Sequence, residues 1–303
     1  MKFIEDVHKE KSLIHKAIER HGHCVEHHLE HYCCCHHEKN KLRFVDLGKK
    51  RGVLLSENGS GVWNLFPNGV LAPAQERWRA LNKVLKFLLL KKKAKKVVVE
   101  VDERFRKEML HNLAASRQLK ALSPNYILYW PIFHMELLDE KMKGKKWKKL
   151  RNIRNRFFKQ HRIRIVDSTK VSKEKLLAIV KQWMRRRKQT DEVTKEYYYN
   201  VISSNFKGFD MAKTIYVDGK PCTITAGWEV KNGEKHYYSA VGLFNYDYPG
   251  LGEFTNLMDL LMLKKKGYRI VDFGGSGASL LNFKSKFKPH QIYKTYSFSV
   301  VRK

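Results

Sequence analysis

The chain has 303 residues, which is enough for one large domain or two of about 150 residues each. Its hydrophobic content of 43% supports a packed core and excludes wholesale disorder. Lys and Arg total 61 against 30 Asp and Glu, and the resulting net charge of +31 favours an anionic partner such as nucleic acid, an anionic membrane surface or a phosphorylated small molecule. The alternative is a solvated lysine-rich surface.

The N-terminal stretch MKFIEDVHKEKSLIHK carries acids and no apolar core, so it does not resemble a signal peptide. The longest aliphatic run, Phe87–Leu90, is too short to span a bilayer. Four of the five cysteines crowd between Cys24 and Cys35, which makes a poor disulfide framework. We therefore expect a soluble, cytoplasmic protein.

Residues 1–40 are predicted to be helical and are rich in His and Cys. On one face of a helix, Cys24 with His27 or His28, or His27 with His31, would supply zinc ligands. The spacing matches no CxxC…CxxC or HExxH pattern, so these four residues are weak candidates and the sequence predicts no metal site. The alternative is a polar helix with a few buried thiols.

The remaining elements alternate between strands and helices in both halves of the chain. In the first half, strands are expected at 43–46, 52–55, 61–67, 97–101 and 126–133, with helices after Pro73 and at 104–119. In the second half, strands are expected at 163–166, 211–219, 222–230, 235–244, 268–275 and 293–301, with helices at 173–187, 196–206 and 252–267. This order predicts an α+β, mixed α/β fold in which the same pattern is used twice.

The segment from Lys141 to Arg164 contains Lys and Arg but no acid. Leu150, Ile153 and Phe157 lie on one face of a predicted helix, and the cations lie mostly on the others. Such a stripe suits the phosphates of a tRNA acceptor arm, and it would also bind anionic lipid headgroups. The candidate polyanion-binding residues are Lys145, Lys146, Lys149, Arg151, Arg154 and Arg156. The interleaved aromatic residues Trp147, Phe157 and Phe158 are candidates for stacking on unpaired bases.

Two glycine-rich segments are candidate anion sites. The strand ending at Asp272 runs into Gly274, Gly275, Ser276 and Gly277, where the backbone can approach a ligand and direct peptide N–H groups at it. Gly250 and Gly252 open a helix whose N-terminus favours negative charge. The alternative for the first segment is a tight corner, with Phe283 and Phe287 in the core and solvated lysines between them.

The run from Tyr246 to Val300, with PGLGEFTNLMDLLMLKKKGYRIVDFGGSG and LLNFKSKFKP, resembles the last half of tandem GNAT-fold transferases. These are the Fem-type peptidoglycan aminoacyltransferases and the soluble synthase domain of lysyl-phosphatidylglycerol synthases. The basic segment GKKWKKLRNIRNRFFKQHRIRIV resembles the helix that joins the two halves in that group. The resemblance implies a GNAT-like domain at 1–140, a bridging helix at 141–162 and a second GNAT-like domain at 163–303 that carries the active site. Each domain would be a mixed, mostly antiparallel sheet with flanking helices.

The resemblance also implies roles for particular residues. The pair Phe283-Lys284 matches an FK pair of Fem-type enzymes, so Lys284 would stabilise the oxyanion and Phe283 would stack on the terminal adenine. Asp272 is the acid nearest the turn and is either the general base or the cap of the turn. GNAT acetyltransferases bind pyrophosphate through Gln/Arg-x-x-Gly-x-Gly/Ala, and here Asp247 occupies the first position, which weakens an acyl-CoA reading.

The expected function is therefore transfer of an amino acid from aminoacyl-tRNA to an amine or hydroxyl acceptor, with no permanently bound cofactor. The expected partners are tRNA or another polyanion, and peripheral contact with an anionic membrane. One alternative is acyl-CoA-dependent N-acyl transfer. A second is a non-catalytic protein that binds RNA or anionic membranes on the same fold.

Overall fold

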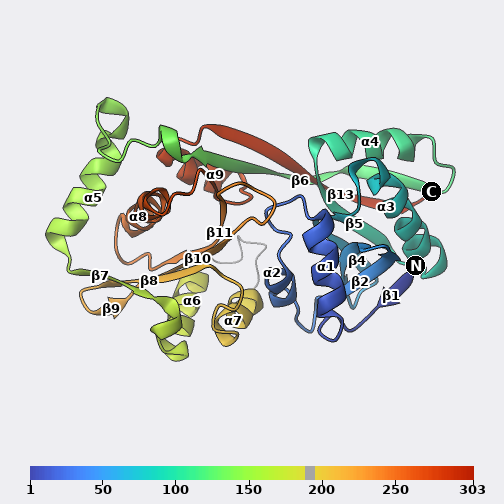
Figure 1. The fold of residues 1–303 in the computed structure, drawn as a ribbon, viewed down its shortest axis with the longest axis horizontal. Helices are drawn as coiled ribbons and strands as arrows, with labels where there is room; N and C mark the ends of the chain where they lie inside the picture. The colour runs from blue at the N-terminus through green and yellow to red at the C-terminus, as the bar shows by residue number, and fades with distance from the viewer. Residues whose placement is uncertain (188–194) are drawn as a thin grey trace. The chain divides into compact units, whose positions relative to one another are not determined.

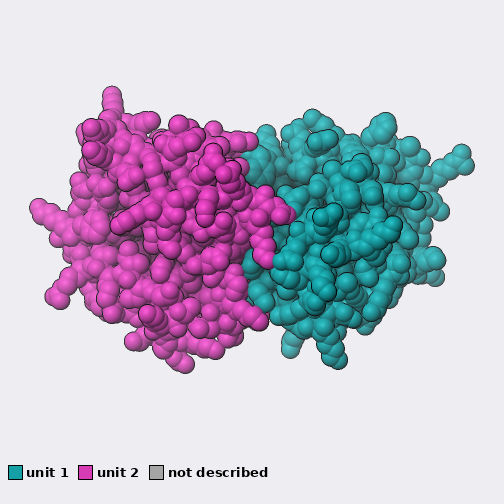
Figure 2. Space-filling model, viewed as in Figure 1, with its two compact units in different colours: residues 1–129, 293–303 teal, residues 130–292 magenta. Residues whose placement is uncertain are grey.

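The computed structural model describes residues 1–187 and 195–303. The chain divides into two compact units, of which unit 1 comprises Met1–Tyr129 and Tyr293–Lys303, and unit 2 comprises Trp130–Ile292 (Figure 2). The units do not divide at the expected boundaries of 140 and 163, because the end of the chain returns to complete the sheet of unit 1.

Unit 1 is built on a sheet with the strand order β1-β2-β3-β4-β5-β13-β6 (Figure 1). The strand pairs β1–β2, β2–β3, β3–β4 and β5–β13 are antiparallel, whereas β4 and β5 run parallel. The strands are β1 (Lys2–Ile4), β2 (Lys41–Gly48), β3 (Arg51–Asn58), β4 (Val62–Leu71), β5 (Lys96–Asp102), β6 (Leu119–His134) and β13 (Gln291–Arg302).

Helices cover both faces of this sheet. Leu81 and Val84 of α3 and Met109 of α4 are fully buried in one apolar cluster with the valines of β5, because their spacing of three and four residues places them on one helical face. Ile14 of α1 is buried in a second cluster with Phe44 of β2. The helices of unit 1 are α1 (Lys11–His21), α2 (Leu29–Cys34), α3 (Arg77–Lys86), the π-helical turn η2 (Phe87–Lys91), α4 (Glu103–Ala114) and the 3-10 turn η1 (Ala74–Glu76).

Unit 2 has the strand order β6-β12-β11-β10-β8-β7, with β9 paired to β8. The predicted hairpin turn at Asp218-Gly219 is confirmed, since both residues have positive φ angles, of 51° and 82°. The further strands of this unit are β7 (Ile163–Asp167), β8 (Met211–Val217), β9 (Lys220–Pro221), β10 (Thr223–Glu229), β11 (His236–Phe244) and β12 (Ile270–Asp272).

The central helix of unit 2, α8, packs its leucines into a core with Phe133 and Val271. The basic helix α5 lies against α8, where the rings of Phe157 and Phe254 stack at a centroid distance of 4.7 Å. The helices are α5 (Lys148–Gln160), α6 (Lys173–Arg187), α7 (Lys195–Ser203), α8 (Leu251–Lys265) and α9 (Ala278–Lys284), with 3-10 turns η3 (Met135–Leu137), η4 (Lys145–Trp147), η5 (Ser168–Lys170) and η6 (Ser285–Phe287). No helix in the described part of the chain combines the length and apolarity needed to cross a membrane.

Several expected elements differ from those observed. Residues 1–40 are not one helix, because Gly22 ends α1 in an extended conformation and residues 22–28 form a loop. The expected bridging helix is α5, which belongs wholly to unit 2 because its apolar face packs on α8. The helix expected at 104–119 ends at Ala114, and strand β6 then begins at Leu119.

Candidate active site

The candidate site lies where strands β11 and β12 separate. These parallel strands pair only from His236 with Ile270 to Tyr238 with Asp272, after which β12 ends and β11 continues to Phe244. The glycine turn therefore begins at the point where the two strands part. In mixed α/β sheets, ligands bind beyond strand ends at such a point.

Asp272 caps the glycine turn. Its carboxylate is fully buried, and its Oδ1 accepts a hydrogen bond of 2.7 Å from the N–H of Gly274. Gly274 has a φ angle of +76°, and a Cβ at this position would lie 3.2 Å from the hydroxyl oxygen of Tyr238. Ser276 is also buried, and its hydroxyl donates to the carbonyl of Gly274 at 3.2 Å. The turn is thus stabilised by hydrogen bonds among its own residues. Its first position, Gly274, favours glycine because of the positive φ angle and the nearby tyrosine.

Lys284, the last residue of α9, is held inside the same turn. Its Nζ donates to the backbone carbonyls of Phe273 and Gly274, the second at 3.0 Å, and the residue is only 9% exposed. Burial lowers the pKa of this ammonium group to about 7, and the negative charge of Asp272 opposes that shift. Lys284 therefore contacts the carbonyl side of the turn.

Phe283 is half-buried among protein side chains. Its ring is stacked with that of Phe244 at 6.1 Å and meets Phe287 edge-on at 5.7 Å, while Nζ of Lys286 lies 5.0 Å from its centroid. Phe287 is fully buried. The neighbours of Phe283 correspond to the core alternative rather than to an open stacking surface.

The start of α8 packs closely against α5 and β11. Gly250 has a φ angle of +88°, and a Cβ there would lie 3.1 Å from a methyl carbon of Ile153 and 3.9 Å from Nη2 of Arg156. A Cβ on Gly252 would lie 2.7 Å from the ring of Phe244. The Gly-x-Gly motif therefore allows the helix to approach both β11 and α5 closely, and it brings a cation of α5 to the N-terminus of α8.

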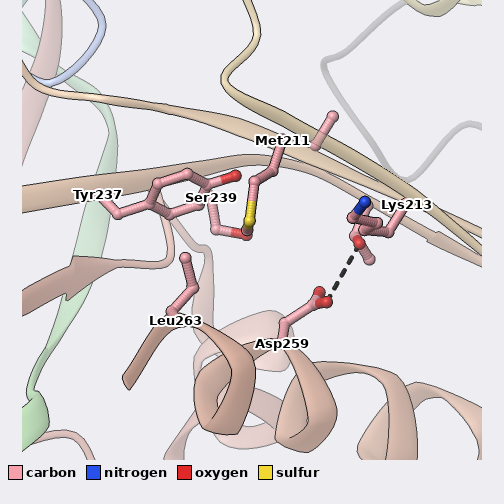
Figure 3. A pocket seen from close by; sticks show the side chains of 8 residues that line it. Met211, Lys213, Tyr237, Ser239, Asp259 and Leu263 are labelled. Atoms are coloured by element: carbon pink, nitrogen blue, oxygen red, sulfur yellow. Dashed lines mark hydrogen bonds between the residues drawn. The ribbon is translucent and has the colours of Figure 1, made fainter. Parts of the chain in front are cut away.

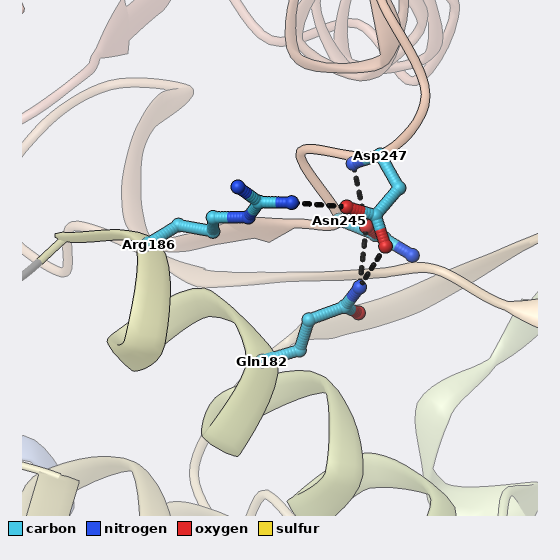
Figure 4. Close-up of polar contacts among 4 residues, drawn as sticks. All are labelled: Gln182, Arg186, Asn245 and Asp247. Carbon is cyan, nitrogen blue, oxygen red and sulfur yellow. Dashed lines mark hydrogen bonds and ion pairs between the residues drawn. The ribbon is translucent and has the colours of Figure 1, made fainter.

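Asp247 forms a hydrogen bond and an ion pair with side chains of α6 (Figure 4). Its Oδ1 lies 3.0 Å from Nη2 of Arg186, and its Oδ2 accepts a hydrogen bond of 2.7 Å from Gln182. Gln182 also donates to Asn245, which in turn accepts from the N–H of Asp247. The acid that departs from the GNAT pattern thus forms an ion pair that ties the β11–α8 loop to α6.

Some of the predicted cations of the basic segment are exposed, and others form hydrogen bonds within the protein. Lys145, Lys146, Lys149 and Arg156 are exposed. Arg151 instead donates to the backbone carbonyls of Met142 and Gly144, and Arg154 donates to the side chain of its neighbour Asn155.

The aromatic side chains of the same segment are mostly unavailable for stacking on bases. Trp147 and Phe157 are buried, whereas Phe158 is 51% exposed although its edge contacts Phe254. Base stacking by Trp147 or Phe157 is therefore excluded.

The weak metal candidates serve the local structure. Neutral His27 accepts from the N–H of His23 through Nδ1 and donates to the carbonyl of Pro67 through Nε2. The Nδ1 of His28 accepts from the N–H of His31 and caps α2. Cys24, His27 and His28 lie in the loop after α1, so helical spacing does not apply to them. Within residues 1–187 and 195–303, no group of three or more His, Cys, Asp or Glu side chains is arranged to hold a metal ion.

An aromatic cluster beside the turn was not predicted. Tyr238 packs against Trp228 at a centroid distance of 4.9 Å and is stacked with Trp130 at 6.3 Å. All three side chains are buried, and Tyr238 is the residue nearest the position of a Cβ on Gly274. The signal in the sequence was weak, because these residues come from three separate strands and share no motif.

The chain is similar to solved structures that include a tandem GNAT protein. The structure described as L-PGS from Bacillus licheniformis is 13% identical, with a TM-score of 0.66, and the match covers 98% of this chain and 92% of that one. FemX is 13% identical with a TM-score of 0.58, covering 99% and 97%. A tandem GNAT protein from the clavulanic acid biosynthesis pathway is 11% identical with a TM-score of 0.58, covering 99% and 98%. The expected tandem GNAT fold is thereby confirmed.

No curated protein matches the chain. The family described as phosphatidylglycerol lysyltransferase, C-terminal, matches residues 26–298, which is most of the sequence. The chain therefore belongs to this family, and it is an enzyme of the acyltransferase and aminoacyltransferase class.

Proposed function

We propose that this chain transfers an aminoacyl group from aminoacyl-tRNA to an amine or hydroxyl acceptor. The observation that carries the proposal is the contact between the basic helix and the site. Arg156 lies beside Gly250 at the start of α8, and Phe157 stacks on Phe254 one turn further along the same helix. A cationic surface and the parted strands β11 and β12 thus belong to one compact unit.

Donor binding uses the exposed cations. Lys145, Lys146 and Lys149 carry no acid near them on α5 or η4, and Arg185–Arg187 add charge at the end of α6. Flexible cations of this kind bind phosphates largely independently of base sequence, with an affinity that falls as salt rises. The backbone of a tRNA acceptor arm fits this surface, and its 3′ end would reach the glycine turn.

The acceptor nitrogen or oxygen attacks the ester carbonyl carbon and forms the new bond. The bond to the ribose oxygen then breaks, and the proton lost by the acceptor neutralises that leaving oxygen. Negative charge on the carbonyl oxygen between these steps is stabilised by peptide N–H groups of the turn. Asp272 is fully buried and accepts from Gly274, so its role is to hold the turn.

Lys284 supports this step from the opposite side of the backbone. In a planar trans peptide the C=O and N–H groups point in opposite directions. By binding the carbonyl of Gly274, Lys284 fixes the direction of the N–H of Gly275. This makes Lys284 a positioning residue rather than the oxyanion ligand that the FK pair implies.

The family description names lysyl transfer to phosphatidylglycerol, so lysyl-tRNA and phosphatidylglycerol are the first donor and acceptor to assay. Peptides and small amines are the other acceptors in this proposal. Acyl-CoA-dependent transfer is the second candidate, and the ion pair between Asp247 and Arg186 supports it. Because the acid is paired, it repels a pyrophosphate at Gly250 less than an isolated carboxylate would.

The experiment that separates the two donors measures binding of the protein to bulk tRNA and to coenzyme A thioesters, each across a salt series. The proposal predicts tRNA binding that weakens steeply with salt, together with no saturable thioester binding. Thioester binding that persists at high salt, with weak tRNA binding, would overturn the tRNA donor in favour of acyl-CoA.

A further inference from the structure

The cavity between α8 and strands β8, β10 and β11 is too small for an anionic ligand (Figure 3). Its accessible space is about 10 Å³, which is the size of one water molecule. Its lining includes the buried acid Asp259, whose Oδ1 accepts a hydrogen bond of 3.2 Å from Thr225. A cavity of this size does not admit a phosphorylated ligand. The exposed cations are therefore the groups available to an anionic partner.

Four exposed lysines gather on the short connection from η2 to β5 in unit 1. The backbone of this connection is fixed, because the N–H of Ala94 donates to the carbonyl of Leu88 and the N–H of Lys95 to that of Gly61, each at 2.9 Å. Lys93 has a φ angle of 54°, and the chain reverses there. The side chains that remain exposed, called here the lysine turn, are those of Lys91, Lys92, Lys93 and Lys95.

The lysine turn carries no counter-charge of its own. In the part of the chain that the structure describes, no ion pair includes any of its four lysines. The Nζ of Lys92 lies over the ring of Phe3 instead, 5.1 Å from its centroid. A helix dipole favours cations only within its last turn, so it accounts for Lys91 and Lys92 but not for Lys95. Like charges held on one fixed turn repel, and an anionic partner relieves that repulsion.

The chemistry of the lysine turn suits an anionic bilayer better than RNA. All four cations are Lys, whose hydrated point charge attracts a charged surface without directional bonds, whereas Arg forms bidentate bonds to single phosphates. No large apolar side chain between residues 83 and 96 is exposed, since Phe87 and Leu90 pack against the core cluster of unit 1. The turn therefore offers neither a ring for base stacking nor an apolar anchor, and it binds through charge alone.

We propose that the lysine turn of unit 1 binds the headgroups of an anionic lipid bilayer. Each Lys close to such a surface strengthens binding about fivefold, so a few lysines together suffice for peripheral attachment. The surface is distinct from the cations of α5, which belong to unit 2. The inference does not depend on the proposed transfer reaction, because vesicles that lack phosphatidylglycerol test it.

The test is cosedimentation of the full chain with vesicles of phosphatidylcholine that contain about 30% phosphatidylserine, an anionic lipid. We expect saturable binding to these vesicles and none to vesicles of phosphatidylcholine alone. Raising the salt from about 0.1 M to about 1 M should abolish the binding, because the Debye length falls from about 10 Å to about 3 Å.

A variant with Lys91→Gln, Lys92→Gln, Lys93→Gln and Lys95→Gln should bind the anionic vesicles at least about 25-fold more weakly, the loss expected from two headgroup contacts. The same four changes to Arg keep the charge and should leave binding within about threefold of the wild type. The matched control removes the same charge elsewhere, by Gln at four exposed lysines, and should weaken binding less than about threefold. Its positions are Lys39, Lys49, Lys50 and Lys120.

No binding of the wild type to the anionic vesicles would overturn the proposal, and so would equal losses in the two Gln variants. A lysine-turn Gln variant that keeps vesicle binding but loses affinity for tRNA would also overturn it, and would identify the turn as a contact for RNA.

Discussion

Lys284 shows how one buried cation can fix the geometry of a glycine turn. Its ammonium group bonds two consecutive carbonyls, those of Phe273 and Gly274, instead of facing solvent. Replacing it with a residue of similar length and no donors leaves these buried carbonyls without their partner, which costs about 1–3 kcal/mol per group. The turn should then relax, and its N–H groups should leave the position that favours the oxyanion.

Lys284→Met should therefore lower kcat for aminoacyl transfer by roughly 100-fold, the scale expected when catalytic groups move by about 1 Å. The KM for aminoacyl-tRNA should stay within about twofold, because Lys284 is buried and the exposed cations proposed to bind the donor are unchanged. Lys288→Met, the same change at an exposed position in the same segment, is the control. Steady-state kinetics of both variants check this. An unchanged kcat in Lys284→Met would show that catalysis does not need the hydrogen bonds from Lys284 to the carbonyls of the turn.

Buried histidines predict acid sensitivity in unit 1. Burial lowers the pKa of His31 to about 3, and it also lowers the pKa of His27 well below its ordinary value of 6.5. The unfolded chain therefore takes up more protons than the folded one as pH falls below 6.5, so stability declines with acid. For His31 alone the loss between pH 7 and pH 5 is about 2 kcal/mol.

Urea unfolding at pH 7 and pH 5 measures this loss. In His31→Gln, which cannot titrate, the decrease in the free energy of unfolding should be about 2 kcal/mol smaller than in the wild type. Equal decreases in both proteins would show that His31 is not kept neutral by burial.

At the scale of elements, helix α5 presents several of the chain's cations on one surface of unit 2. Its apolar face is fixed on α8, so its cations keep a defined position relative to the turn. Neutralising four of them, in a Lys145→Gln, Lys146→Gln, Lys149→Gln, Arg154→Gln variant, should reduce the slope of log K against log salt for tRNA binding by about 3.

The matched control replaces four exposed lysines of unit 1, Lys39, Lys41, Lys49 and Lys50, with Gln. Both variants carry the same net charge. Filter binding of tRNA across a salt series therefore distinguishes direct contact with the substituted residues from attraction by the total charge of the protein. Equal slopes in the two variants would mean that tRNA responds only to total charge and would remove α5 from the proposed binding surface.

At the scale of the whole molecule, the fold of unit 1 depends on the end of the chain. Strand β13 lies between β5 and β6 in the sheet order, and it pairs antiparallel with β5 from Thr295 to Val300. Phe298 and Val300 are buried in the core cluster of unit 1. A chain that stops at Ile292 lacks almost all of β13, the strand that lies between β5 and β6.

Truncation after Ile292 should therefore unfold unit 1. In hydrogen exchange, amides of β4 and β5 should lose protection in the truncated chain, whereas those of β8 and β10 in unit 2 should keep most of theirs. Retained protection in β5 would show that the sheet of unit 1 closes without β13.

The elements of unit 2 and the glycine turn could be predicted from the sequence, because they depend on local patterns of apolar residues and glycines. Gly250 at the start of α8 and Asp272 before the turn both lie where periodicity and glycine placement put them. The return of β13 was not predictable in this way, since strand order is set by long-range pairing. The burial of Lys284 was not predictable either, because a charged residue in an amphipathic segment is normally solvated, and its burial is known only once the packing is known.

The most direct test of the account is a single-turnover assay with [14C]lysyl-tRNA and phosphatidylglycerol vesicles, alongside other charged tRNAs and small amines as acceptors. We predict protein-dependent transfer of label from tRNA to an acceptor, reduced about 100-fold in Lys284→Met with tRNA binding intact. Binding of tRNA with no transfer from any aminoacyl-tRNA, and transfer from a coenzyme A thioester instead, would contradict it.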